Sequence, residues 1–170
     1  MRHSPKSCHE TDRGLPVADL GYSAGERAVL RVIRHYCVSF AAPAQQGWIG
    51  GIAAALEAFG DERGPHVAVA ALGVMQTLRQ ARQSGFRFNT PECPSCALHV
   101  TSHERLLMSA LRAISRDRPE AARAHAVLLC EGNAAERVTE ALALLAAQAF
   151  APCANAPGKI RPEPVAGDAR

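Results

Sequence analysis

The sequence predicts an all-α fold, a compact bundle of about six helices with flexible N- and C-terminal arms. Apolar residues recur every three or four positions through the central part of the chain, which is typical of helices that pack on one face. No segment alternates apolar and polar residues as a half-buried strand does. Prolines and glycines separate the periodic segments and leave connections of roughly 3 to 10 residues, which favours a bundle.

Length and composition agree with one globular domain. The chain has 170 residues, of which 48% are hydrophobic and 21% are charged. These values exclude a wholly disordered chain, a collagen-like repeat and a coiled-coil fibre. Proline and glycine gather with polar residues at both ends of the chain. We therefore expect a flexible arm over residues 1–22, a helical domain over 23–150 and a disordered tail over 151–170.

The first three helices are expected over residues 24–40, 45–59 and 65–84. Ser23 and Glu26 have the spacing of a capping box, in which each side chain bonds a free backbone N–H group. The second helix contains three glycines that can let another backbone approach closely. The expected buried faces are Val29, Val32, Ile33, Tyr36, Cys37 and Phe40 in the first helix, Trp48, Ile49, Ile52, Leu56 and Phe59 in the second, and Val67, Ala71, Val74, Met75 and Leu78 in the third.

Three further helices complete the predicted bundle. The fourth is expected over 94–116, and the fifth begins near Pro119 and ends at Gly132, a residue type that favours the position after a helix. Asn133 and Glu136 resemble a second capping box, which predicts a sixth helix over 134–150. The expected buried residues are Val100, Leu107, Leu111 and Ile114 in the fourth helix and Val138, Leu142, Leu145 and Ala149 in the sixth.

Charge and hydropathy narrow the range of partners. The 19 basic and 16 acidic residues are interleaved and leave a net charge of +3, so nucleic-acid binding is disfavoured. The longest apolar stretch, 67–75, is far shorter than the roughly 20 residues that a membrane helix needs. The N-terminus lacks the apolar region of a signal peptide. We therefore expect a cytoplasmic protein.

The chain has six cysteines, at positions 8, 37, 93, 96, 130 and 153. In a reducing cytosol, cysteines indicate metal binding, redox chemistry or simple burial rather than a disulfide framework. Cys8 and Cys153 fall in the predicted arms, which makes fixed ligand roles for them unfavourable. Cys37 and Cys130 sit in apolar surroundings and read first as core residues.

The segment 91–104 contains Cys93, Cys96, His99 and His103 at the spacing C-x2-C-x2-H-x3-H. On one continuous helix, Cys96 and both histidines share the core-facing side, and burying imidazoles without partners is unfavourable. Thiolate and imidazole are the ligands that Zn²⁺ prefers, so the pattern predicts a zinc site with a structural or sensory role. Cys130 or Cys37 can replace one of these ligands, and convergence of all four core cysteines would instead indicate an iron–sulfur cluster.

Two other interpretations of the same segment stay open. In the first, Cys93 attacks a disulfide, Cys96 resolves the mixed disulfide and His99 or His103 moves protons, which would make the chain a thiol–disulfide oxidoreductase. In the second, each histidine bonds a backbone carbonyl or an acidic side chain of a neighbouring helix, and the chain is a metal-free interaction module whose alanine-rich helices pair with a partner or with a second copy. Under the last interpretation, and also for a metal-binding sensor, a homodimer is a possible assembly.

Several charged residues surround the segment. Arg79, Arg82 and Arg87 flank it and can bind an anion or help to hold a thiolate. Glu104 can orient a ligand histidine, although its helical position predicts an exposed side chain. No phosphate-binding glycine loop, serine nucleophile elbow or zinc-protease motif is present, which disfavours enzymes built on those chemistries and leans the prediction away from an enzyme.

Overall fold

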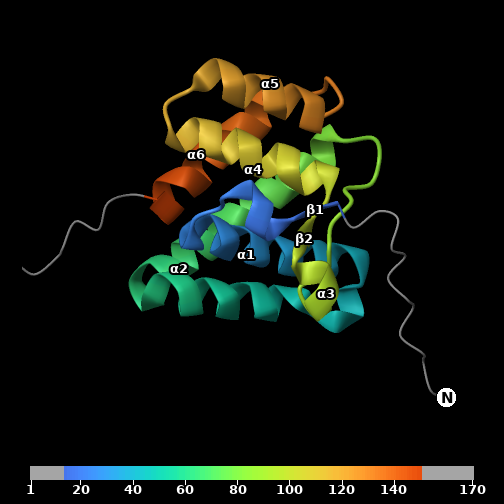
Figure 1. Ribbon diagram of the computed structural model, residues 1–170, viewed down its shortest axis with the longest axis vertical. Coiled ribbons are helices and arrows are strands. Elements are labelled where there is room, and N and C mark those ends of the chain that lie inside the picture. The colour runs from blue at the N-terminus through green and yellow to red at the C-terminus, as the bar shows by residue number, and fades with distance from the viewer. Residues whose placement is uncertain (1–13, 151–170) are drawn as a thin grey trace, which may run out of the picture.

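The structure is a computed structural model that describes residues 14–150. Over this range the chain is an all-α bundle (Figure 1). Its α-helices are α1 (Ala24–Ala41), α2 (Gly47–Ala81), α3 (Pro94–Ala97), α4 (Ser102–Ser115), α5 (Pro119–Leu129) and α6 (Ala135–Phe150). Two short strands, β1 (Leu15–Pro16) and β2 (His99–Val100), and two 3-10 turns, η2 (Val17–Leu20) and η3 (Pro43–Gln45), complete the fold.

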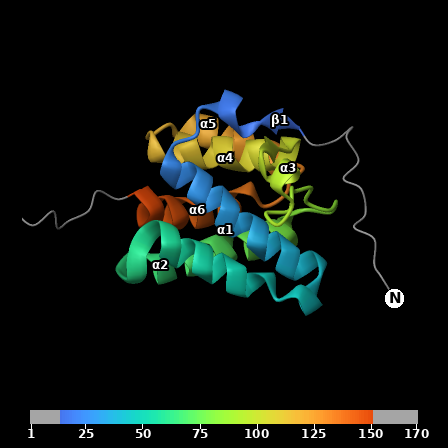
Figure 2. The same ribbon diagram turned by 60° about the horizontal axis from the view of Figure 1, so that its bottom comes forward.

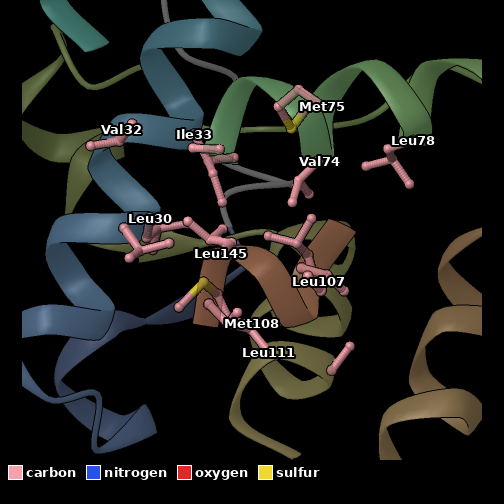
Figure 3. Close-up of a cluster of buried hydrophobic side chains, with 14 of the residues drawn as sticks. Leu30, Val32, Ile33, Val74, Met75, Leu78, Leu107, Met108, Leu111 and Leu145 are labelled. Atoms are coloured by element: carbon pink, nitrogen blue, oxygen red, sulfur yellow. The ribbon is translucent and has the colours of Figure 1, made fainter. Parts of the chain in front are cut away.

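The helices form two groups that meet at one core. Helix α1 packs mainly on α2, α4 packs on α5 and α6, and α2 also contacts α6 (Figures 1 and 2). Figure 3 shows that side chains of α1, α2, α4 and α6 converge where the groups meet. This part of the core contains Leu30, Val32, Ile33, Val74, Met75, Leu78, Leu107, Met108, Leu111 and Leu145, all of which are buried. Burial of this apolar surface provides the main favourable free energy of folding.

Helix α2 spans most of the two segments, 45–59 and 65–84, that were predicted as separate second and third helices. Its backbone leaves helical geometry at Gly60, where φ is 76° and ψ is 174°. That conformation suits glycine, and it lets the chain change direction between the two halves of α2 (Figure 1). A Cβ atom on Gly64 would lie 2.8 Å from Cα of Leu56, so the two halves also need a glycine there to approach each other. The predicted break between the two helices is therefore present, at Gly60.

The first half of α2 turns its glycines, rather than its large apolar residues, toward α1. Built Cβ atoms would lie 2.5 Å from the backbone oxygen of His35 at Gly47 and 2.6 Å from the His35 ring at Gly50. Close packing of the two helices on their glycine side leaves the other side of α2 in solvent. The predicted burial of Trp48, Ile49 and Ile52 is wrong, because these side chains are 48%, 50% and 37% exposed.

The predicted continuous helix over 94–116 is wrong. Helix α3 ends at Ala97, strand β2 follows, and α4 begins at Ser102. Thr101 and Glu104 form a capping box at the start of α4, which fixes this second helix start. Strand β2 pairs antiparallel with β1, with Leu15 opposite Val100 and Pro16 opposite His99. Strands of two residues are too short to leave an alternating pattern in the sequence.

The predicted helix boundaries elsewhere agree closely with the structure. The capping box of Ser23 and Glu26 is present at the start of α1. Gly132 follows α5 with a φ of 81°, and its N–H donates to the Val127 oxygen at 2.9 Å. Helix α6 begins at Ala135, and the Asn133 amide donates instead to the oxygens of Cys130 and Glu131, so the second predicted capping box does not form.

The N-terminal arm predicted over residues 1–22 contains ordered structure in its last part. Strand β1 pairs with β2, η2 follows, and Tyr22 is buried at 6% exposure. These contacts come from β2 and from Arg112, whose guanidinium lies 5.1 Å from the Tyr22 ring centre, and both are distant in sequence. The rest of the arm, the tail over 151–170, Cys8 and Cys153 lie outside the described residues. None of the helices between residues 14 and 150 combines the length and apolar character needed to cross a membrane.

Candidate functional site at Cys93 and Cys96

Cys93 and Cys96 lie in a single helical turn on the surface of the bundle. Cys93 is the N-cap of α3, Pro94 is its first residue, and the Ala97 N–H donates to the Cys93 oxygen at 2.9 Å. Cys93 has extended backbone geometry (φ −93°, ψ 110°), and Cys96 follows three positions later inside the turn. Cys93 is partly exposed, whereas Cys96 is buried at 5% exposure. The two thiols therefore differ in their access to solvent.

Arg34 of α1 fixes the segment that carries the two cysteines. Its guanidinium donates to the Ala97 oxygen at 2.9 Å and also to the His99 oxygen. The Asn89 side-chain amide donates to the same His99 oxygen at 2.8 Å. Arg34 is more than 60 positions away along the chain and Asn89 is 10, and their bonds satisfy carbonyl groups that α3 and β2 leave without helical partners.

Glu104 holds Arg34 in place and is fully buried. The guanidinium of Arg34 donates to the two carboxylate oxygens of Glu104 at 2.7 and 3.0 Å, and the Arg34 side chain is 4% exposed. The carboxylate also accepts the backbone N–H groups of Thr101 at 2.8 Å and Asn89 at 3.1 Å. Burial of these charges is possible because each has several partners. The prediction of an exposed Glu104 is wrong.

The two histidines of the motif bond backbone groups in different directions. Nδ1 of His99 lies 3.0 Å from the Ser95 oxygen, and because a carbonyl can only accept, this nitrogen carries the proton. Nδ1 of His103 instead accepts the backbone N–H of Arg87 at 3.0 Å. The His103 ring also lies beside Phe86, with ring centres 5.7 Å apart. Both imidazoles therefore have backbone partners.

The helical side that was expected to gather Cys96, His99 and His103 does not exist, because β2 interrupts the helix. Between residues 14 and 150, no three side chains of His, Cys, Asp or Glu form a group that could hold a metal ion. Cys37 and Cys130 are reduced thiols buried in the core. Zinc and iron–sulfur binding stay predictions of the sequence, without a ligand group in this part of the chain.

Cys37 and Cys130 differ from the partly exposed Cys93 in their burial. Burial raises the pKa of the Cys37 thiol far above its usual range, and burial is also the main cause of the raised pKa of Cys130. Both thiols therefore stay protonated near neutral pH, and a protonated thiol is a poor nucleophile. At Cys93, by contrast, Sγ lies 3.3 Å from the Ser95 hydroxyl, which can donate a hydrogen bond to a thiolate.

A hollow of about 400 Å³ lies beside the cysteine segment. Pro91, Ala97 and Leu98 form the wall contributed by this segment, and Leu98 is 65% exposed. Three arginines of α1, at positions 27, 31 and 34, line the opposite wall. Neither Cys93 nor Cys96 is among the residues that line this hollow.

Sequence reasoning missed Arg34 and Asn89, which position the segment. The pattern Thr-x-x-Glu at 101–104 was a readable signal for the start of α4, but the expectation of one long helix concealed it. No family of known proteins matches the chain, and neither the curated proteins nor the solved structures contain a significant match. The functional argument therefore depends on the site itself.

Proposed function

We propose that this protein carries out thiol–disulfide exchange through Cys93 and Cys96. The observation that carries the proposal is the unequal exposure of two cysteines in one helical turn, with Cys93 accessible and Cys96 buried at 5% exposure. An exchange reaction needs one thiol that reaches the substrate and a second that reaches only the first. The other two cysteines between residues 14 and 150 are buried in the core.

The reaction balances as a two-electron exchange. The Cys93 thiolate attacks one sulfur of a substrate disulfide, forms a mixed disulfide and releases the first substrate thiolate. Cys96 gives its proton to the released substrate thiolate and attacks Sγ of Cys93, which releases the second substrate thiolate and leaves a disulfide between Cys93 and Cys96. The substrate is reduced and the cysteine pair is oxidised. A low-molecular-weight thiol such as glutathione then reduces the pair.

The hydrogen bonds of Arg34 support this role by limiting movement of the segment. The guanidinium binds the oxygens of Ala97 and His99, which directly follow the turn that contains both cysteines. A fixed turn keeps the resolving sulfur close to the attacking one in both oxidation states. The effective concentration of Cys96 at Cys93 is therefore higher than in a flexible peptide.

The test uses the full chain and glutathione disulfide, with the modified residues identified by mass spectrometry. We expect the wild type to form a Cys93–Cys96 disulfide, and Cys96→Ser to retain glutathione on Cys93. Cys93→Ser should protect Cys96 from glutathione, because that residue is buried. Cys37→Ala is the matched control and should behave like the wild type. If a synthetic peptide of residues 91–99 formed its disulfide as readily as the protein does, the fold would not be needed to bring the two cysteines together.

Metal analysis separates this proposal from the zinc and iron–sulfur predictions. Protein purified without chelators should contain far less than one metal ion per chain. One equivalent of zinc, or an iron–sulfur absorption band, that is lost in Cys93→Ser and kept in Cys37→Ala would overturn the redox proposal. That result would assign the cysteine pair to a metal centre instead.

We propose self-association as a second candidate property, because of the exposed side of α2. Trp48, Ile49 and Ile52 are each more than a third exposed, and they lie on the side of α2 that faces away from α1. A second copy of the chain can cover the same residues in a two-fold dimer. Sedimentation equilibrium should show dimers that Trp48→Ala weakens and that Leu144→Ala, at a 65% exposed position of α6, does not. A monomer at all concentrations would contradict this.

A further inference from the structure

A second hollow, also about 400 Å³, opens where α1 and the C-terminal end of α2 meet the loop over 82–88. Its volume lies in the range of small-molecule binding sites. Three half-buried phenylalanines line it, Phe40, Phe86 and Phe88, and the chain has five phenylalanines in all. Met75, Leu78 and Cys37 form more of the lining. The interior of this hollow is therefore mainly apolar.

The charged residues that line this hollow all have the same sign. Arg79 and Arg82 belong to the lining, and no aspartate or glutamate does. Arg82 is paired with Glu131 at 3.0 Å, and its side chain is only 4% exposed. Arg79 is exposed, donates to the neutral Gln76 amide at 3.1 Å and lies 4.3 Å from the centre of the Phe40 ring. No carboxylate in the described part of the chain forms an ion pair with Arg79, so its charge can attract an anion.

We propose that this hollow binds a small amphipathic carboxylate, with its apolar body among the phenylalanines and its carboxylate at Arg79. The stacking of Arg79 on Phe40 places the cation next to the apolar surface, which is the arrangement that such a ligand matches. An arginine can donate two hydrogen bonds to one carboxylate. This binding property is independent of the proposed chemistry at Cys93, which lies outside the lining.

The outer wall of the hollow is held by bonds from distant parts of the chain. Glu131, which follows α5, accepts the backbone N–H groups of Gln83 at 2.9 Å and Ser84 at 3.2 Å, and it also accepts the Ser84 hydroxyl. His103 of α4 accepts the Arg87 N–H at 3.0 Å and stands beside Phe86. Because this wall is fixed without a ligand, binding needs little further ordering of the chain.

Decanoate is the first probe, and decanol is its uncharged counterpart. Titration calorimetry and backbone amide NMR of the full chain should show decanoate binding, with shifts at Phe40 and Phe86. Arg79→Gln should lower the affinity for decanoate by about three- to tenfold and leave the affinity for decanol unchanged, because only the anion interacts with the guanidinium. Arg123→Gln, at an exposed position of α5, is the matched control and should bind decanoate like the wild type.

A large side chain placed at the rim of the hollow tests whether decanoate binds inside it, without changing a core residue. Ala41 lines the hollow and is exposed, so Ala41→Trp should fold normally and weaken decanoate by about tenfold or more. Ala44→Trp, at an exposed position that does not line the hollow, should have no effect. Bound decanoate should also slow alkylation of Cys37. Absence of binding, or equal affinity in wild type, Ala41→Trp and Arg79→Gln, would overturn the proposal.

Discussion

Arg34 and Glu104 form a buried ion pair between α1 and α4, although 70 positions separate them along the chain. The two side chains are 4% and 0% exposed, and two hydrogen bonds of 2.7 and 3.0 Å join them. The same guanidinium bonds the oxygens of Ala97 and His99. One buried pair thus connects the first helix, the cysteine segment and the start of α4.

Removing one charge of this pair should strongly destabilise the fold. Glu104→Gln leaves the Arg34 guanidinium buried without a counter-charge, and we expect the free energy of unfolding to fall by about 3–5 kcal/mol. Urea denaturation measures the change. Glu57→Gln is the control, because Glu57 pairs with Arg31 at the surface, where the side chains are 66% and 54% exposed. That substitution should change stability by about 1 kcal/mol or less, and equal losses in the two variants would refute our interpretation.

Two glycines of α2 should respond in opposite directions to alanine. At Gly47 the new Cβ would lie 2.5 Å from the backbone oxygen of His35, so α1 and α2 must move apart. We expect Gly47→Ala to destabilise the protein by about 1–3 kcal/mol. A Cβ at Gly73 meets nothing within 4 Å, so Gly73→Ala should stabilise the same helix by about 0.5–1 kcal/mol. Thermal unfolding of both variants tests the close contact.

Acidification should weaken the loop that borders the apolar hollow. Hydrogen bonds from the Ser84 hydroxyl and from the N–H groups of Gln83 and Ser84 lower the pKa of Glu131 from 4.5 to about 2. Because the folded pKa is the lower one, this carboxylate contributes stability above pH 4.5 and loses that contribution as the pH falls toward 2. Unfolding free energies measured across this range should fall more steeply for the wild type than for Glu131→Gln. Parallel curves would show that Glu131 contributes nothing.

The hydrogen bond between the Arg87 N–H and His103 can be tested by amide exchange. His103→Ala removes the acceptor, so the Arg87 amide should exchange about fivefold faster, as expected for a hydrogen bond with a net value of about 1 kcal/mol. His99→Ala serves as the control, because that ring bonds the Ser95 oxygen instead. In the His99→Ala variant, the exchange rate of the Arg87 amide should stay unchanged. Unchanged exchange in His103→Ala would show that this histidine does not hold the loop that borders the hollow.

The sequence by itself determined most helices and their buried sides. The capping box of Ser23, the position of Gly132 after α5 and the apolar spacing within α1, α4 and α6 are local signals, and local hydrogen bonds and side-chain periodicity decide such features. These predictions succeeded because each depends on interactions within a few residues.

Only the tertiary structure decided how the cysteine segment is built and which side of α2 is exposed. The break after Ala97 is stabilised by Arg34, which bonds oxygens more than 60 positions away. The spacing of apolar residues along the sequence does not reveal such a distant partner. Trp48 faces solvent because the glycines of α2 fit more closely against His35 than a large side chain would. Contacts between distant residues therefore determined the geometry of the site, because long-range packing outweighs local helix preference and a charge buried without its partner is costly.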